Sequence, residues 1–402
     1  MSSPPLSEVT RANARILTTA QALGGASPAI IVSLGGIVGQ QLASNPAFAT
    51  LPISLYNLGM AIGTLPAAWL MRKYGRRGGY MLGAMLGIVS GLVAASGIYM
   101  GAFLIFCLGT LIAGFYGSYV QSYRFAAVDG VPESYRPKLI SMVMIGGLFA
   151  AIIGPQTVIW TRDAIVWAPF AGSFVGQAIL ALIALPFIMR LRTVVMPPPP
   201  AGQSQTGRSL GEIAAQPRFI VAVIAGIVSY GLMSFVMTAA PIAMVGCGHT
   251  IGEAALGIQW HVLAMYGPSF VTGKLIERFG KSTITSVGLI LIAMSAAVGL
   301  SGLGLTHFWL ALILLGIGWN FGFVGATAMV TDCYRPEERT RVQAMNDFLV
   351  FGAVAASSFS SGKLLSVAGW ELINQMVFPI VGTVLVLIWW QAARNNKEAK
   401  LA

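Results

Sequence analysis

Two side chains in apolar surroundings could carry chemistry in this chain. His261 lies in the apolar run GIQWHVLAMYG, and Arg124 lies in VQSYRFAA. An imidazole titrates near neutral pH and can carry a proton, whereas a guanidinium stays charged and attracts anions. Two alternatives stay open. His261 can simply hydrogen-bond a neighbouring helix, and Arg124 can extend to the water interface or pair with Asp129 or Asp347.

Aromatic and amide side chains accompany these two groups. His261 corresponds to Tyr56 under an internal repeat described below, so both rings are expected near the axis that relates the two halves. Ring stacking with a few hydrogen bonds suits a neutral or anionic, flat, partly aromatic solute. Each aromatic residue can equally serve helix packing. The other candidates for substrate contact are Gln21, Tyr116, Gln121, Tyr230, Gln259, Trp260, Trp319 and Asn320.

Motifs of enzymes and metal sites are missing from the sequence. The chain has no HExxH, no GxSxG and no nucleotide-binding Gly-x-x-x-x-Gly-Lys-Ser/Thr. Cys107, Cys247 and Cys333 are far apart and share no metal-ligand spacing with the histidines. None of the 13 acidic residues lies near the middle of an expected helix. We expect no enzyme activity, no metal and no cofactor, and the missing midplane carboxylate disfavours an organic cation as substrate.

Composition places the chain in a membrane. Hydrophobic residues make up 56% and charged residues 9%, against about 25% charged in soluble domains. Apolar runs of about 20 residues can cross the bilayer as helices. The sequence therefore predicts an all-α integral membrane protein. Its twelve expected spans are residues 14–41, 47–71, 79–99, 101–128, 138–160, 164–189, 219–245, 251–276, 282–302, 305–331, 342–366 and 370–392.

The net charge of +11 is unevenly placed along the chain. Basic residues gather in alternate loops, and only Arg162 and Lys363 fall on the other side. The positive-inside rule then predicts both termini in the cytoplasm of an inner-membrane protein. This distribution disfavours nucleic acid as a partner. The first apolar run is too long for a cleavable signal, so we expect it to direct insertion itself.

The two halves of the chain repeat one another. The basic loop Ala68–Arg77 (AWLMRKYGRR) matches Gly273–Lys281 (GKLIERFGK) at an offset of 205 residues, with Gly75 on Gly280. Paired halves of this kind are typical of secondary transporters.

A polar interruption separates these halves. It contains four consecutive prolines, Pro197–Pro200, and then a flexible Gly/Ser/Gln stretch. Leu210–Ala215 could form a short helix at the membrane face. The expected division is 1–189 for a first six-helix bundle, 190–218 for a linker and 219–402 for a second bundle.

This organisation resembles the major facilitator superfamily, whose loop pattern is Gly-x-x-x-Asp-Arg-x-Gly-Arg-Arg. The resemblance implies twelve helices in two pseudo-symmetric six-helix bundles. It is closest in kind to compact bacterial carriers of drugs, metabolites or riboflavin. The first copy departs from the pattern, because Ala68 replaces the first glycine and Arg72 stands at the acid position. The second copy matches it at Gly273, Glu277, Arg278, Gly280 and Lys281.

The resemblance also implies a cytoplasmic gate built from these loops. The acid of each loop would cap a helix of the other half and lock that side. Arg72 cannot do this, so Asp347 could supply the acid by pairing with Arg72 or Arg76. The alternative is that Asp347 only caps its own helix. Gly75, Glu277, Arg278 and Gly280 complete the expected gate.

The sequence therefore predicts a secondary active transporter that works by alternating access. We expect a monomer in the lipid bilayer that moves a small organic solute, such as a flavin, together with protons. The alternative is a proton-coupled multidrug efflux antiporter. A membrane receptor is a less favoured interpretation, because a receptor would usually carry a sizeable soluble domain. Symport and antiport stay open, because Gly154-Pro155 only partly resembles an antiporter signature.

Overall fold

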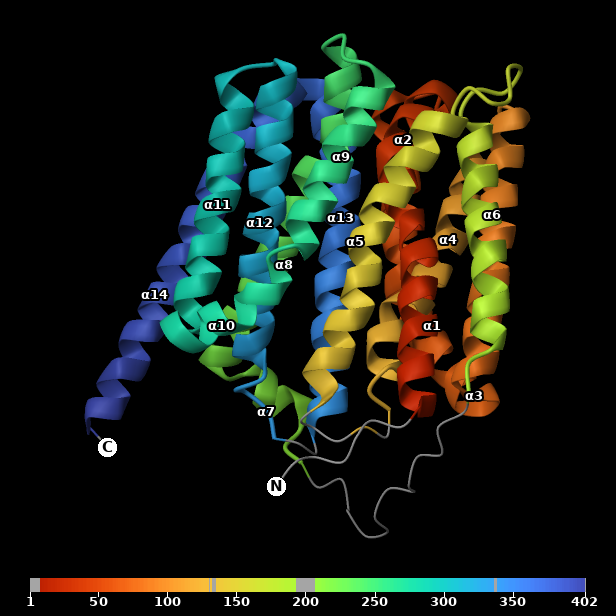
Figure 1. The fold of residues 1–402 in the computed structure, drawn as a ribbon. Helices are drawn as coiled ribbons and strands as arrows, with labels where there is room; N and C mark the ends of the chain where they lie inside the picture. The colour runs from red at the N-terminus through yellow and green to blue at the C-terminus, as the bar shows by residue number, and fades with distance from the viewer. Residues whose placement is uncertain (1–7, 130, 132–134, 193–206, 336–337, 402) are drawn as a thin grey trace.

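The structure is a computed structural model that describes residues 8–129, 131, 135–192, 207–335 and 338–401. Within these ranges the regular structure is helical and contains no strand (Figure 1). The elements are α1 Glu8–Gly24, α2 Ala26–Leu42, the 3-10 helix η1 Pro46–Phe48, α3 Leu51–Tyr99, α4 Phe103–Ala126, α5 Arg136–Thr161, α6 Ala171–Met189, α7 Leu210–Ala214, α8 Pro217–Gly246, α9 Ile251–Tyr266, α10 Ser269–Phe279, α11 Lys281–Ser301, α12 Leu305–Val330, α13 Arg339–Gln375 and α14 Val377–Leu401.

Ten helical segments of the described chain are long and apolar enough to cross a membrane. One of them, Pro46–Tyr99, has 54 residues. A straight helix of that length would reach roughly 80 Å, far beyond a hydrocarbon core of about 30 Å. Conversely, α9 and α10 are too short when taken separately. The predicted twelve crossings require α3 to count as two helices, divided at Gly75, and α9 and α10 to count as one crossing.

Two glycines with the same backbone conformation occur in the two basic loops. Gly75 interrupts α3 with φ 72° and ψ 169°, and Gly280 separates α10 from α11 with φ 88° and ψ 154°. Residues with a side chain rarely adopt this region. The prediction that these glycines turn the chain between two helices is confirmed.

Two helix boundaries differ from the prediction, and a third agrees. The helix α6 begins at Ala171 rather than at residue 164. Pro169 disfavours a helical residue before it, and Phe170 is left-handed with φ 72°. The expected span 251–276 is divided at Pro268, which has no N–H to donate. The predicted short helix before the second half is present as α7, where Ser209 and Glu212 form a capping box.

Hydrophobic cores reveal an asymmetry between the two ends of the bundle. We call the end where α1 begins and α14 ends the terminal end, and the other end the opposite end (Figure 1). One core uses only residues between Ala14 and Leu191, and another only residues between Val221 and Ile388. A third core joins α2 residues such as Ile30 with Ala255 of α9. The helices before and after the linker thus share a core only toward the opposite end.

An ion pair between Arg208 and Glu338 holds the residues that directly precede α7 in place. The carboxylate of Glu338 is fully buried and accepts hydrogen bonds from Arg208 Nη2 at 2.8 Å, Arg208 Nε at 3.0 Å and the Arg335 backbone N–H at 2.9 Å. These donors, the Arg208 side chain foremost, lower the pKa of Glu338 to about 2. The segment entering α8 is thereby tied to the turn before α13.

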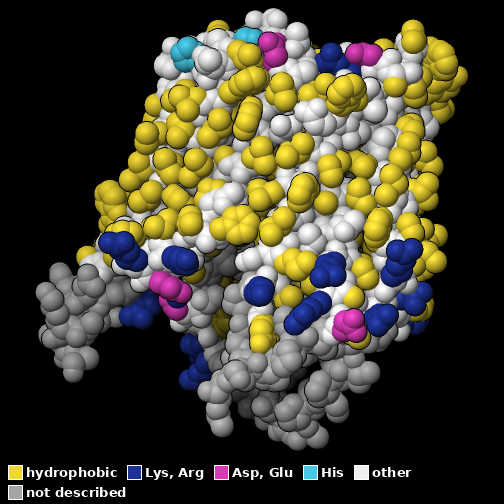
Figure 2. All heavy atoms as spheres, in the orientation of Figure 1, with side chains coloured by type: hydrophobic (Ala, Val, Ile, Leu, Met, Phe, Trp, Pro, Cys, Tyr) yellow, Lys and Arg dark blue, Asp and Glu magenta, His cyan; other side chains and the backbone are white. Residues whose placement is uncertain are grey.

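The surface of the bundle suits a bilayer. Figure 2 shows a broad hydrophobic band, with most of the visible Lys and Arg side chains at the terminal end. Trp160 and Trp167 are exposed near the opposite end, and Trp389 and Trp390 are exposed on α14 toward the terminal end. Tryptophans are typical of membrane–water interfaces. The protein is therefore a multi-pass membrane protein.

The left-handed glycine turns generate a first prediction. Gly280→Ala or Gly75→Ala should destabilise the protein by about 1–3 kcal/mol, because alanine is strained at this φ and ψ. No atom lies within 4 Å of an added Cβ at either site, so the cost comes from the backbone alone. Gly273→Ala is the matched control, since Gly273 lies in helical α10 with equally open space. The measurement is the melting temperature of the purified protein. Equal melting temperatures for Gly280→Ala and Gly273→Ala would contradict this account.

Candidate functional site

An aromatic cluster from three helices surrounds Tyr230. We give this name to Tyr230 of α8, Trp319 and Phe323 of α12, and Phe351 of α13. The Tyr230 ring centroid lies 5.3, 5.0 and 5.7 Å from those of Trp319, Phe323 and Phe351. Trp319 and Phe323, one turn apart, stack at 5.4 Å with 17° between their planes. Tyr266 adds an edge-to-face contact to Trp319 at 6.5 Å. These separations are typical of attractive ring pairs.

Asn320, predicted to contact substrate, instead braces the break between α9 and α10. Its Nδ2 donates to the backbone oxygen of Met265 and to Ser269 Oγ, both at 2.7 Å. Its Oδ1 accepts a hydrogen bond from Thr272 Oγ1 at 2.6 Å. The side chain is fully buried. Both ends of the Asn320 amide are already hydrogen-bonded within the protein, so the amide is not free to bond a substrate. Asn320 instead holds in place the helices that carry Tyr266 and Trp319.

Arg124 brings a positive charge from α4 toward the aromatic cluster. Its guanidinium lies within electrostatic range of Tyr230, Tyr266 and Asp347, which belong to α8, α9 and α13. Its Nε is buried and has no hydrogen-bond partner among the described residues. A charged donor in a low-dielectric region is costly without an acceptor. A ligand with hydrogen-bond acceptors could accept the hydrogen bond that Arg124 Nε does not donate within the described structure.

Neither acid proposed as a partner of Arg124 forms an ion pair with it. Asp129 is held by Arg76, with Nε–Oδ2 at 2.9 Å and Nη2–Oδ1 at 3.3 Å. Asp347 accepts a hydrogen bond from Asn346 Nδ2 at 3.2 Å. In the described part of the chain, no carboxylate lies within 4.0 Å of the Arg124 guanidinium. Of the alternatives that the sequence left open, pairing with Asp129 or Asp347 is thus not formed in the described structure, whereas extension to the water interface and attraction of a ligand both stay predictions.

The predicted pair of His261 and Tyr56 is split between two places. His261 is fully buried, and its Nδ1 donates to the Leu312 backbone oxygen at 2.7 Å. It therefore packs between α9 and α12, as the hydrogen-bonding alternative predicted. Tyr56 lies within electrostatic range of Tyr230 and Tyr266 across the two groups of helices. Only Tyr56 of this pair is near the aromatic cluster.

Two predicted neighbours of His261 on α9 have different surroundings. Gln259 Oε1 accepts a hydrogen bond from Gln156 Nε2 of α5 at 3.1 Å. Trp260 is 44% exposed on the surface of the bundle. Gln259 thus links the helices before and after the linker, whereas Trp260 is not part of the aromatic cluster.

The remaining predicted residues lie on α1 and α4. Tyr116 is buried, with its hydroxyl beside Gly24 of α1. Gln21 packs beside Gly146 of α5. Gln121 is exposed one turn before Arg124 on the same helix face. Gln121 is therefore the member of this group that accompanies Arg124.

The two basic loops carry matching ion pairs that sequence reasoning missed. Arg76 pairs with Asp129, and Lys281 Nζ pairs with Asp332 Oδ1 at 2.6 Å. Each pair stays within its own group of helices. The repeat already aligned Arg76 with Lys281, and both following loops contain an acid, so superposing the halves would have predicted both pairs.

The pair expected between Asp347 and Arg72 or Arg76 is not formed in this structure. Arg76 is bonded to Asp129, and Arg72 is exposed. Glu277 and Arg278 are exposed on α10, where Arg278 lies over the Phe279 ring at 5.1 Å. The gate at the terminal end is therefore not locked in the form that the resemblance implies.

Comparison with known proteins decides the family. The model of the Major Facilitator Superfamily matches residues 16–296 and 224–401. The chain belongs to the major facilitator superfamily. The riboflavin transporter RfnT of Brucella anthropi is 62% identical over 376 residues, 94% of each chain. The uncharacterized MFS-type transporter YdeG of Bacillus subtilis is 30% identical, over 93% of this chain and 89% of that one.

Solved transporter structures share the fold. A mutant of the nucleoside transporter NupG aligns with a TM-score of 0.72 at 14% identity, covering 95% of this chain and 99% of that one. The POT family transporter PepTSo aligns with a TM-score of 0.73 at 12% identity, covering 99% and 100%. Family and fold together show a membrane transporter of a small molecule and not an enzyme, as the sequence predicts.

Uncharged side chains join the helices before and after the linker toward the opposite end of this superfamily member. Asn57 Nδ2 donates to Ser358 Oγ at 2.8 Å, and the Ser358 hydroxyl also bonds Ser234 Oγ at 2.7 Å. With Gln156 and Gln259 we call these residues the neutral seam. Each such hydrogen bond is worth only about 0.5–1.5 kcal/mol net. These hydrogen bonds therefore add little to the free energy that holds the helices together at this end.

The neutral seam generates a second prediction. Asn57→Cys with Ser358→Cys, in a chain whose native cysteines are replaced by serine, should form a disulfide readily on oxidation. The two side chains already touch in this structure. Transport should stop when the opposite end is locked and return with a reductant. The measurements are the fraction cross-linked and the transport rate.

Arg124→Cys with Asp347→Cys is the control pair at the terminal end. It should cross-link poorly, because these side chains are not in contact in the described structure. Efficient cross-linking of the control together with none at the seam would contradict closure at the opposite end.

Proposed function

We propose that this chain transports riboflavin or a closely similar flavin. The observation that carries the proposal is the aromatic cluster facing an arginine whose Nε has no acceptor among the described residues. A flavin ring system is flat and aromatic, and the carbonyl groups along one edge accept hydrogen bonds. Stacking on the cluster and donation from Arg124 would recognise both features. The 62% identity to a riboflavin transporter supports the same substrate.

The positive charge of Arg124 supports a neutral or anionic substrate over a cationic drug. An organic cation near the cluster would meet the Arg124 charge, which like-charge repulsion disfavours. A neutral flavin needs no counter-ion, and its acceptor edge offsets the desolvation of the guanidinium. Multidrug efflux, the alternative that the sequence left open, thus has less support from this site.

Transport would proceed by alternating access of two six-helix bundles, residues 1–189 and 219–402, joined by the linker 190–218. Separate cores at the terminal end and a shared core at the opposite end support this division. The basic loops support a cytoplasmic terminal end in the inner membrane, with both termini inside. The structure would then be closed to the outside, with its aromatic cluster facing the cytoplasm. The protein would act as a monomer.

Proton coupling would involve Asp347 more directly than His261. Asp347 lies on α13 within electrostatic range of Arg124, so its protonation would change the field at the substrate site. His261 donates its Nδ1 proton to the Leu312 backbone oxygen away from the cluster. A proton on Asp347 could therefore be exchanged for, or carried with, the substrate.

The third prediction tests the role of Arg124 in flavin transport. Removing a charge-assisted hydrogen bond costs about 1.5–3 kcal/mol, so Arg124→Gln should raise the KM for riboflavin about 10- to 100-fold. Arg124→Lys should lose less, because the charge remains while the planar fork is lost. The measurement is riboflavin uptake by proteoliposomes that contain purified protein.

Lipophilic cations serve as the competing substrates in the same assay. Proton-driven export of such cations without flavin movement would overturn the proposal in favour of drug efflux. Flavin transport with an unchanged KM in Arg124→Gln would support a flavin as the substrate but contradict a role of Arg124 in binding it.

A further inference from the structure

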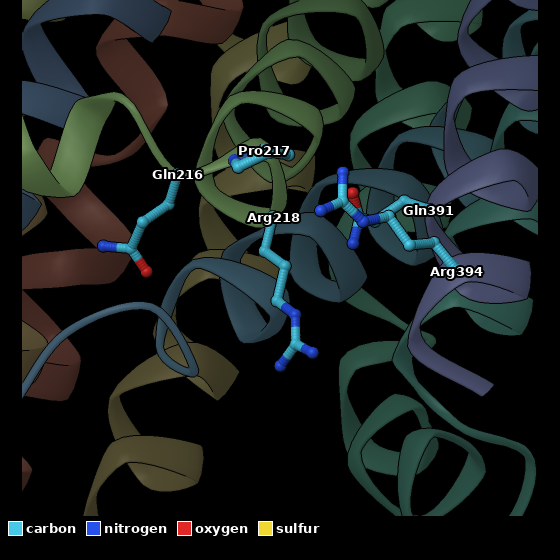
Figure 3. A pocket seen from close by; sticks show the side chains of 5 residues that line it. All are labelled: Gln216, Pro217, Arg218, Gln391 and Arg394. Atoms are coloured by element: carbon cyan, nitrogen blue, oxygen red, sulfur yellow. The ribbon is translucent and has the colours of Figure 1, made fainter. Parts of the chain in front are cut away.

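The two ends of the bundle have different surface features. At the terminal end, a cavity of about 290 Å³ lies between the start of α8 and the last turns of α14 (Figure 3), and it is lined by Gln216, Pro217, Arg218, Gln391 and Arg394. Near the opposite end, Trp160 and Trp167 are both 79% exposed. Exposed tryptophans are typical of the membrane–water interface. The two tryptophans therefore share an environment, and they differ in what their side chains bond.

Trp160 differs from Trp167 because its indole N–H is bonded within the protein. Trp160 Nε1 donates to Gln156 Oε1 at 3.1 Å, one turn earlier on α5. Gln156 Nε2 in turn donates to Gln259 Oε1 of α9 at 3.1 Å, and α5 and α9 lie side by side (Figure 1). Within the described part of the chain, the Trp167 side chain makes no hydrogen bond. A chain of hydrogen bonds thus leads from Trp160 on the surface to α9, which follows the linker.

The order of donors and acceptors along this chain fixes the orientation of the Gln156 amide. An indole N–H can only donate, whereas an amide accepts through its oxygen and donates through its NH2 group. Trp160 therefore holds the Gln156 oxygen on its own side and directs Nε2 toward Gln259. A reversed amide would set two donors against each other at Trp160. Only one of the two orientations therefore satisfies both neighbours of Gln156.

Ordering the Gln156 side chain in advance favours its contact with α9. A glutamine loses much rotamer freedom when a contact holds it in one conformation. The bond to Trp160 lies within α5, so it can form whether or not α9 is in contact. Gln156 then meets Gln259 already in its bonding conformation, and such preorganisation lowers the entropic cost of association. Donation into the amide oxygen also polarises the amide and strengthens its own N–H as a donor.

We propose that Trp160 is a positioning residue for the hydrogen bond between Gln156 and Gln259. This inference rests on the alternating access of two bundles under the proposed function, but not on the identity of the substrate. The indole N–H favours the state in which the bundles are joined at the opposite end. Without it, the bundles separate more often there. The loss of one neutral hydrogen bond shifts such an equilibrium about 2- to 10-fold.

The experiment measures how fast a cysteine at position 358 reacts with a charged thiol reagent. Ser358 is fully buried in the neutral seam. The reagent therefore reaches Ser358→Cys only when the bundles separate, and the labelling rate reports the population of that state. The parent protein is the full chain in lipid nanodiscs, with Ser358→Cys and with its native cysteines replaced by serine. The same cysteine is present in every variant, so its own effect on the seam cancels.

Two phenylalanine variants are compared in this parent protein. Trp160→Phe keeps an aromatic ring and removes the N–H, and it should raise the labelling rate about 2- to 10-fold. Trp167→Phe is the matched control and should leave the rate unchanged. Trp167 has the same exposed fraction and, in the described structure, no hydrogen bond to lose. In a Gln259→Leu background, Trp160→Phe should add nothing, because the bond that Trp160 positions is already lost.

Equal labelling rates for the parent protein and Trp160→Phe would overturn the inference. An equal rise in both phenylalanine variants would also overturn it, and so would a full effect of Trp160→Phe in the Gln259→Leu background. A different result would count against the proposed transport cycle itself. If no variant reacts although riboflavin uptake proceeds, the bundles do not separate at this end, and both alternating access and the role of Trp160 are wrong.

Discussion

Polar groups inside a bilayer must find their partners within the protein, because hydrocarbon offers none. This constraint accounts for most of the structure. Backbone groups are satisfied in long helices, and the Asn320 amide satisfies the Met265 backbone oxygen beside the break at Pro268. The hydroxyl groups of Ser234 and Ser358 satisfy each other between helices. Among the buried side-chain atoms that have no partner in the described structure, Arg124 Nε stands out because it belongs to a permanently charged group. The proposed site is built on that charge.

The same constraint explains why the two ends of the bundle differ. At the opposite end the contact between α3 and α13 is made by neutral side chains such as Asn57 and Ser358. Neutral groups can separate without leaving a charge in hydrocarbon. At the terminal end, Arg76–Asp129 and Lys281–Asp332 each stay within one group of helices. The charges thus stabilise the loops, and neutral hydrogen bonds join the parts that the proposed cycle must separate.

Much of the fold follows from the sequence, because long apolar runs separated by basic loops have few other solutions. Gly75 and Gly280 indicate the two turns, and the sequence also points to Tyr230 and Trp319, whose rings are in contact. Phe323 and Phe351 were missed, since an aromatic residue in an apolar run carries no sign of its neighbours. The alignment of His261 with Tyr56 predicted a position near the axis, but a helix that is apolar all round does not indicate which of its faces turns inward. The contact between Asn57 and Ser358 joins residues 301 positions apart. No local pattern predicts such a contact.

Riboflavin fluorescence offers the most direct test of the central claim, since stacking on tyrosine or tryptophan quenches flavin emission. The measurement is a titration of riboflavin with purified protein, using Trp319→Leu and the exposed control Trp260→Leu. The account predicts saturable quenching by wild type and Trp260→Leu, and loss of quenching in Trp319→Leu. Quenching that survives in Trp319→Leu, or saturable binding that no member of the aromatic cluster affects, would contradict it.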